Sequence, residues 1–162
     1  MSRVALLTAM LFAGCNGDSG GPNVDLRAEM LGLWTMTAVN DADFPWVEQG
    51  PPNQFEIVAG AIRFGNFDLA GNTFQVCRRV TIDDEVDVTG TLVEFAWNVQ
   101  REGEVLVSVP AWEYLPGAYQ ATVADGVLNL EWTGDIGGDR VYTFERATND
   151  PGAALPGCGQ DD

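Results

Sequence analysis

The side chains that most often carry enzyme chemistry are scarce in this sequence. It contains no histidine and no lysine, so all eight basic residues are arginines. Histidine is the commonest general base and metal ligand, and its absence also removes Ser-His and Cys-His nucleophile pairs. A glycosidase needs two carboxylates facing each other across a cleft, and the spacing of Glu94, Glu113 and Glu131 singles out no pair. We therefore expect a protein that is not an enzyme and that holds no cofactor.

Clustered acids are the other candidates for chemistry. Four acidic residues fall within Asp83–Asp87, and Asp135 and Asp139 flank a glycine-rich turn. Carboxylate oxygens are the ligands that Ca²⁺ prefers. Neither cluster has EF-hand spacing, and a solvated charged loop accounts for both. We expect no metal site.

The overall charge excludes another class of partner. The 24 acidic and 8 basic residues give a formal net charge of −16, which would repel a nucleic-acid backbone. A chain of 162 residues, of which 46% are hydrophobic, is long enough for one globular domain with a short appendage.

The N-terminus has the layout of an export signal. Arg3 precedes the apolar stretch Val4–Phe12, and two small residues stand directly before Cys15. This stretch is too short for a transmembrane helix, which needs about 20 residues. The segment Leu11–Cys15 (LFAGC) resembles the lipobox of bacterial lipoproteins, which implies that residues 1–14 are removed and that Cys15 carries acyl chains such as palmitate. Asn16 after the cysteine favours the outer membrane or cell envelope over the inner membrane.

Once Cys15 is assigned to the lipid, two cysteines are left. Export would place Cys77 and Cys158 in an oxidising compartment, where a disulfide is the default. Two unpaired thiols are the alternative. The chain offers too few soft ligands for these cysteines to form a metal site.

Alternation of apolar and polar residues predicts β-strands almost without interruption after Gly32. Before them come a flexible polar linker, residues 15–24, and a short helix over Asp25–Leu31. The eight predicted strands are Leu33–Asn40, Phe55–Phe64, Asn72–Ile82, Thr91–Gln100, Glu104–Val109, Ala118–Ala124, Val127–Trp132 and Arg140–Arg146. A long loop follows the first strand, and Gly60 indicates a bulge in the second. The tail, residues 148–162, has turn composition and would be ordered where Cys158 ties it down.

Successive antiparallel strands leave two exposed edges unless the sheet closes. We therefore predict an all-β fold, an eight-stranded antiparallel up-and-down barrel over residues 25–147. A two-layer sandwich is the alternative, but most connections are too short to pass between two sheets.

Two short motifs resemble a known family. Gly32-Leu33-Trp34 on the first strand resembles the Gly-x-Trp signature of lipocalins, and Val141–Arg146 resembles their closing strand. With that ending, the stretches Leu31–Pro45 and Ile57–Phe74 are similar to bacterial lipocalin-like lipoprotein domains.

The resemblance implies roles for particular residues. Trp34 would close one end of the barrel, and Arg146, or Arg140 in another register, would lie across its ring. A guanidinium over an indole contributes about 0.5–2 kcal/mol. The resemblance also implies a disulfide that ties the C-terminal segment to the barrel, a role that fits Cys77 and Cys158.

An eight-stranded barrel either holds one small ligand or is filled by its own side chains. The side chains that would line an apolar cavity are Met36, Phe74, Phe95, Trp97, Tyr119 and Tyr142. Arg78 is the lone cation on this face and would bind a carboxylate at the mouth. Trp46, Trp112 and Tyr114 stand in loops, where they would form a lid or a partner-binding patch. The alternative is that the aromatic side chains pack the core and Arg78 faces solvent or pairs with an acid.

These features predict a lipid-anchored protein of the cell envelope, held on a membrane through Cys15, that binds or carries a small hydrophobic ligand. The alternative, from another functional class, is a non-catalytic envelope module with a filled barrel that meets another protein through its loops. A cavity inside the barrel favours the first function, and a plugged interior favours the second.

Overall fold

The computed structural model describes residues 23–65, 71–99, 105–108, 118–132 and 140–159. The predicted features that lie outside these residues are the signal peptide, Cys15, most of the 15–24 linker, and Trp112, Glu113, Tyr114, Asp135 and Asp139. Among the described residues, no helix has both the length and the apolar character that crossing a bilayer requires.

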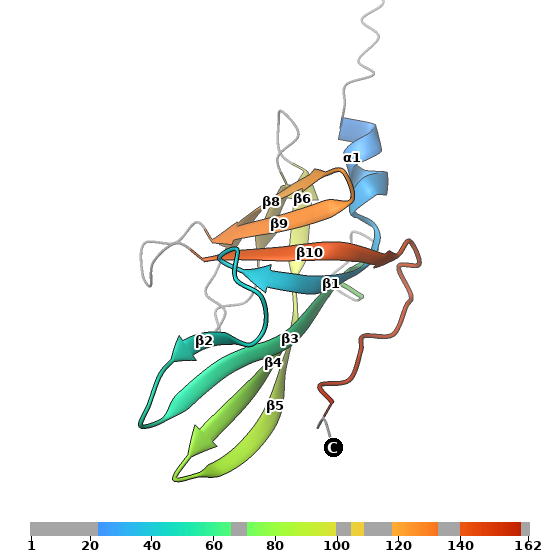
Figure 1. The fold of residues 1–162 in the computed structure, drawn as a ribbon. Helices are drawn as coiled ribbons and strands as arrows, with labels where there is room; N and C mark the ends of the chain where they lie inside the picture. The colour runs from blue at the N-terminus through green and yellow to red at the C-terminus, as the bar shows by residue number, and fades with distance from the viewer. Residues whose placement is uncertain (1–22, 66–70, 100–104, 109–117, 133–139, 160–162) are drawn as a thin grey trace, which may run out of the picture.

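The described residues form one short helix and ten strands (Figure 1). Helix α1 spans Asn23–Met30 and begins two residues before the predicted helix. The strands are β1 Gly32–Val39, β2 Trp46–Gln49, β3 Gln54–Phe64, β4 Thr73–Ile82, β5 Glu85–Glu94, β6 Ala96–Val99, β7 Val105–Ser108, β8 Ala118–Ala124, β9 Val127–Trp132 and β10 Val141–Thr148. The prediction of an all-β, antiparallel protein is confirmed.

The strands form one sheet with the order β5-β4-β3-β1-β10-β9-β8-β7-β6, and β2 pairs with β3 beside this path. The first and last long strands pair directly. Trp34 lies opposite Arg146, and Met36 lies opposite Phe144. This meander places segments from both ends of the chain side by side at the centre of the sheet (Figure 1).

The predicted closed barrel is wrong, because the hydrogen-bonded sheet has two ends, β5 and β6. These two strands replace the single strand predicted over Thr91–Gln100, and only Phe95 separates them. The Phe95 amide donates to the carbonyl of Asn72 (3.2 Å), just beyond the last β4–β5 pair, and β6 then pairs with β7. The chain thus stops pairing with β4 where it begins to pair with β7. Among the described residues, β5 and β6 each have a partner strand on one side only.

The acidic stretch predicted as a loop is largely part of a hairpin. Asp83 and Asp84 have φ values of 50° and 66°, which are typical of the two central residues of a tight hairpin turn. Strand β5 therefore begins at Glu85, six residues before the predicted strand. Figure 1 shows the β4–β5 hairpin projecting away from the end of the sheet that carries α1.

Gly60 does not form the predicted bulge. The register shift between β3 and β4 lies between Ile57 and Ala59, and Gly60 pairs in register with Val76. A Cβ atom on Gly60 would lie 2.5 Å from the terminal methyl carbon of Met36. The glycine therefore leaves room for the end of the Met36 side chain, which would have to shift for any larger residue.

Candidate functional site

One end of the core is covered by α1, Trp34 and Arg146. Trp34 is fully buried, and its indole nitrogen donates to the Met30 carbonyl at 3.0 Å. The guanidinium carbon of Arg146 lies 4.0 Å from the centre of the Trp34 ring. Arg146 also donates to the carbonyls of Leu31 (2.9 Å) and Glu29. The cation thus satisfies carbonyls at the C-terminal end of the helix, where positive charge is favoured.

The structure therefore brings together the residues that the resemblance paired. Arg146, and not Arg140, lies over Trp34. The pair covers one end of a sheet that does not close by hydrogen bonding, so it closes this end of the core and not a complete barrel.

The opposite end of the core holds a group of polar side chains. Val39 pairs with Tyr142 five residues along β1 from Trp34, and strands rise about 3.3 Å per residue. This end is therefore roughly 16 Å from the Trp34–Arg146 pair. It contains Arg78, Arg140 and Glu48, which interact with one another, together with two buried tyrosines.

Glu48 joins the two arginines. The Arg78 Nε donates to Glu48 Oε2 at 3.0 Å, and the Arg140 Nη1 donates to Glu48 Oε1 at 3.0 Å. Arg78 is only 5% exposed, so its charge lies inside the protein. These side chains come from two strands, β2 and β4, and from the residue that directly precedes β10. Among the described residues, two positive charges share this one carboxylate.

Two tyrosines extend this group into the core. Arg140 also donates to the hydroxyl of Tyr142 (3.3 Å), and the Tyr119 and Tyr142 rings lie 6.0 Å apart. Tyr119 is 1% exposed, and its hydroxyl has no hydrogen-bond partner of good geometry among the described residues. Burial raises the pKa of Tyr119, and neighbouring Tyr142 raises it further. Burial also raises the pKa of Tyr142, against the influence of Arg140. Both hydroxyls are therefore neutral and able to donate a proton in a hydrogen bond.

Strand β2 covers this polar group from outside. Trp46 and Glu48 are half-buried while Val47 and Gln49 are exposed, which is the alternation of a strand with one inner face. The guanidinium carbon of Arg140 lies 5.2 Å from the centre of the Trp46 ring. Trp46 was expected in a loop, as part of a lid, and it is instead in this short strand.

The predicted cavity-lining residues are all buried, and the apolar ones belong to one hydrophobic cluster. Within it, Phe74 packs edge-on against Tyr142 and Phe144, and it faces Tyr119, so these rings adjoin Arg78 and Arg140. Phe95 and Trp97 pack against Phe64, and Met36 lies against Gly60.

Phe95 and Trp97 belong to the junction between β5 and β6. The Trp97 indole nitrogen donates to Asn72 Oδ1 at 3.2 Å, and the same oxygen accepts from the Gly65 amide at 2.8 Å. Asn72 is fully buried and so holds the β3–β4 connection to the strand that changes partners. The structure therefore gives these two predicted ligand contacts a role in packing.

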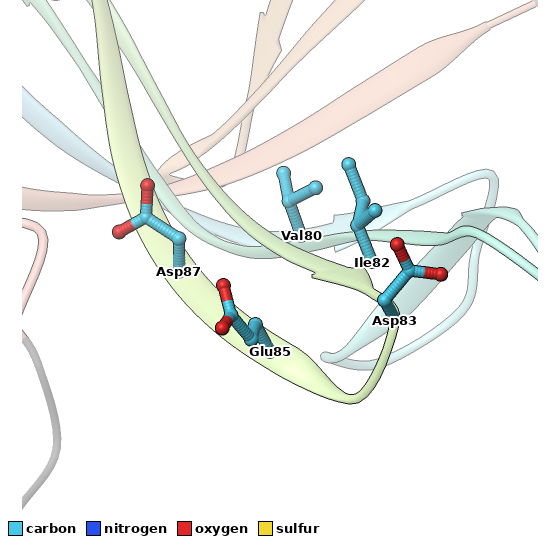
Figure 2. A pocket seen from close by; sticks show the side chains of 5 residues that line it. All are labelled: Val80, Ile82, Asp83, Glu85 and Asp87. Carbon is cyan, nitrogen blue, oxygen red and sulfur yellow. The ribbon is translucent and has the colours of Figure 1, made fainter.

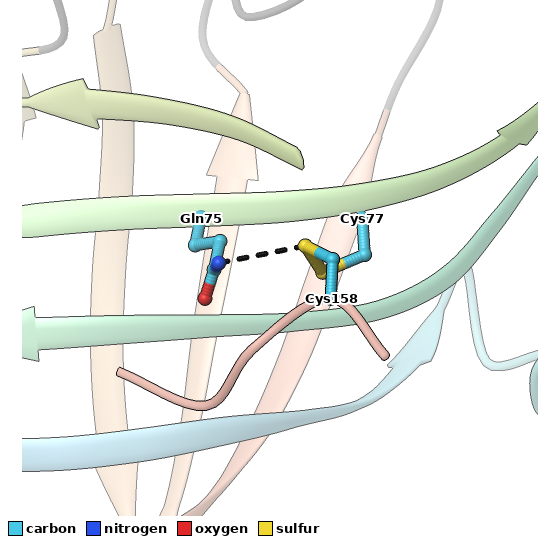
Figure 3. The surroundings of a disulfide bond; sticks show 3 residues. All are labelled: Gln75, Cys77 and Cys158. Carbon is cyan, nitrogen blue, oxygen red and sulfur yellow. Dashed lines mark hydrogen bonds between the residues drawn. A yellow bond between two sulfur atoms is a disulfide. The ribbon is translucent and has the colours of Figure 1, made fainter. Parts of the chain in front are cut away.

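The disulfide between Cys77 and Cys158 is confirmed (Figure 3). It joins β4 to the C-terminal tail, and the Gln75 side chain donates to the Cys158 sulfur at 3.4 Å. A Cβ atom on Gly90, the β5 residue paired with Cys77, would lie 2.8 Å from this sulfur. The tail thus crosses the outer surface of β4 and β5 at Gly90, which has no side chain to block it.

The acidic β4–β5 hairpin carries a surface pocket of about 490 Å³ (Figure 2). It is lined by Val80, Ile82, Asp83, Glu85 and Asp87. No group of three or more metal-ligating side chains is present among the described residues. The pocket opens to solvent at the end of the hairpin, and Val80 in its lining shares a strand face with Arg78, two residues before it.

Sequence reasoning found Arg78, Tyr119 and Tyr142 but did not assign Glu48 or Arg140 to this end. Glu48 lies in the segment predicted as a loop, and nothing local marks it as the partner of Arg78, 30 residues away. Arg140 is the first residue of a predicted strand. Its spacing from Tyr142 could have shown that both side chains lie on the same face of this strand, because residues i and i+2 share a face.

Neither a comparison with models of known protein families nor a search of curated proteins finds a match for this chain.

Proposed function

We propose that this protein is a lipid-anchored, lipocalin-like protein of the cell envelope that binds a small hydrophobic ligand. The binding end of the core is the one that contains Arg78 and Arg140, opposite the Trp34–Arg146 pair. The single observation that carries the proposal is a buried arginine beside a fully buried tyrosine hydroxyl that lacks a hydrogen-bond partner among the described residues.

Energetics favour a binding role for these groups over a purely structural one. A buried ion pair rarely adds net stability, because desolvation of the charges offsets their attraction. A buried hydroxyl left unsatisfied costs about 1–3 kcal/mol. Apolar side chains in these positions would make a more stable core, so the polar groups are better explained by a ligand that they contact.

The lipocalin-like assignment rests on three features that act together. A Gly-x-Trp motif begins the first long strand, an arginine from the last strand lies across that tryptophan, and a disulfide ties the tail to the sheet. The membrane anchor rests on the LFAGC segment before a polar stretch.

Native mass spectrometry of protein extracted from membranes in mild detergent, without refolding, tests ligand binding. We expect a non-covalent small molecule that is lost when the protein is denatured. An apo mass from native membranes, together with no binding of apolar probes by the purified protein, would overturn the proposal.

Metabolic labelling with palmitate tests the anchor separately. We expect label on the wild-type protein and none on Cys15→Ser, with Cys158→Ser as the control that keeps the label. Equal labelling of Cys15→Ser would exclude this cysteine as the lipid site.

A second candidate function is a non-catalytic module that contacts another envelope protein. It is favoured by the edge-to-face packing of the core aromatic rings, which fills the part of the interior near α1. It is also favoured by two exposed apolar side chains on one face of β5, Val86 (62%) and Leu92 (53%). Cross-linking in intact cells through a photoreactive residue at position 92 tests it: a specific adduct that Val86→Asp abolishes supports this function.

A further inference from the structure

The arginine pair inside the core already holds a carboxylate, which belongs to the protein itself. Glu48 accepts from Arg78 with both oxygens, at 3.0 and 3.4 Å, and one of them also accepts from Arg140. This arrangement fits the planar shape of a carboxylate, since an arginine donates in a fork that matches its two oxygens. Any anionic head group bound here must therefore replace the carboxylate of Glu48.

The backbone of the segment that carries Glu48 is joined to the sheet on one side. Among the described residues, strand β2 is four residues long, pairs with β3 alone, and contains a register shift between Val47 and Gln49. Its inner face is held by the contacts of Trp46 and Glu48 with the two arginines, and its outer side chains are exposed. A ligand that takes over the arginines therefore removes most of what holds this short, solvent-exposed strand in place.

One polar group close to this site has no hydrogen-bond partner of good geometry among the described residues. The Tyr119 hydroxyl is buried beside Tyr142 and within electrostatic range of Arg140 and Arg78, yet no described residue accepts its proton with good geometry. A head group that entered from the apolar side, next to Phe74, would meet this hydroxyl as well as the arginines.

We propose that Glu48 stands in for the carboxylate head group of the ligand, and that β2 is a lid which a single-chain monocarboxylic acid displaces. This inference rests on the proposed function and adds the chemical class of the ligand and its competition with Glu48. A neutral head group cannot replace the Glu48–arginine pairs, so the site selects acids over alcohols of the same chain length. The wild-type affinity is reduced because the competent, lid-open form is a minor fraction.

Decanoate and decan-1-ol are suitable probes, and binding to the full-length protein in detergent can be measured by isothermal titration calorimetry. We expect decanoate to bind at least about tenfold more tightly than decan-1-ol. Glu48→Gln removes the internal competitor, so it is expected to tighten decanoate binding by about tenfold or more and to tighten decan-1-ol binding less, because only the carboxylate gains the arginines as partners. Arg140→Met is expected to weaken decanoate binding in either background.

Glu56→Gln is the matched control. Glu56 lies on β3 opposite Val47 and pairs with a different arginine, Arg79, at 3.5 Å. The variant makes the same change of charge next to the lid but leaves Arg78 and Arg140 with their partner, so it should bind decanoate as the wild type does.

Hydrogen exchange of the wild-type protein gives a readout that does not depend on any variant folding. Decanoate is expected to speed amide exchange in residues 46–49 and leave β1 and β10 unchanged. The inference is overturned if decanoate and decan-1-ol bind equally, if Glu48→Gln binds decanoate no better than Glu56→Gln, or if 46–49 becomes more protected. Equal binding of both probes would still support the proposed function, which fails only if no apolar molecule binds.

Discussion

Removing the disulfide should destabilise the protein by about 2.5 kcal/mol, which is less than its loop length alone suggests. The bond closes a loop between residues 81 apart in sequence. In the chain-entropy treatment, such a loop restricts the unfolded chain by about 4.5 kcal/mol at 25 °C. That figure assumes that the folded state is unaffected when the bond is absent.

The folded state also gains freedom without the bond, because the tail is held at a second point. Arg63 donates to the Ala153 carbonyl at 3.0 Å, so only the segment between Ala153 and Cys158 is released. Closing a tether of about five residues costs about 2 kcal/mol by the same relation, which offsets part of the loss.

Urea denaturation followed by tryptophan fluorescence measures this difference between the oxidised protein and the Cys77→Ala/Cys158→Ala variant. Alanine avoids placing a hydroxyl at the buried Cys77 position, which is 2% exposed. A loss of 4.5 kcal/mol or more would refute release of the tail, and a loss below about 1 kcal/mol would refute the loop-closure reasoning itself.

Three further predictions concern polar side chains in the core or at its end, each measured by urea denaturation. Asn72→Ala should destabilise the protein by about 2–4 kcal/mol, because the Trp97 indole N–H and a backbone amide lose their shared acceptor. Arg146→Leu should cost about 2–3 kcal/mol and lower the helical signal in circular dichroism, since the carbonyls at the end of α1 lose their donor. Tyr119→Phe should stabilise the apo protein by about 1 kcal/mol, because it removes an unsatisfied buried hydroxyl. Burial raises the pKa of Tyr119 in the folded state, so deprotonation of this hydroxyl favours unfolding. The free energy of unfolding of the wild-type protein should therefore fall as pH rises above about 10, the pKa of an unfolded tyrosine, and Tyr119→Phe should lose less stability there.

Each of these predictions has an outcome that contradicts it. An Asn72→Ala variant as stable as the wild type would mean that the β5–β6 junction does not depend on this side chain. Unchanged helical signal in Arg146→Leu would show that α1 is held by its apolar contacts alone. A destabilised Tyr119→Phe would show that the hydroxyl has a partner, such as a buried water.

Much of the fold followed from local pattern. Alternation located most of the long strands, and the Asp125-Gly126 turn between β8 and β9 has the positive φ values, 53° and 79°, that its residue types favour. The pairing of the first and last strands was also predicted, because a meander of eight strands brings its ends together only if it curls round.

The failures of prediction share a cause. Strand β2 is four residues long and exists because it pairs with β3, so its own sequence is too short to show a period. The break at Phe95 depends on the Asn72 carbonyl, which comes from another strand connection. Alternation along Thr91–Gln100 continues through this break, so the pattern could not indicate that the strand changes partners.

The sequence by itself placed Arg78 on the strand face of Phe74 and Val76, and left open whether this side chain meets a ligand, solvent or an acid. It also predicted that Cys77 pairs with Cys158 and that the fold is built of antiparallel strands. Only the tertiary structure decided what Arg78 meets. Its partner Glu48 and the second arginine, Arg140, are 92 residues apart and come together through a strand that forms only against its neighbour. Side-chain direction is a local property of the backbone, whereas the meeting of charges inside a sheet depends on how distant segments pair.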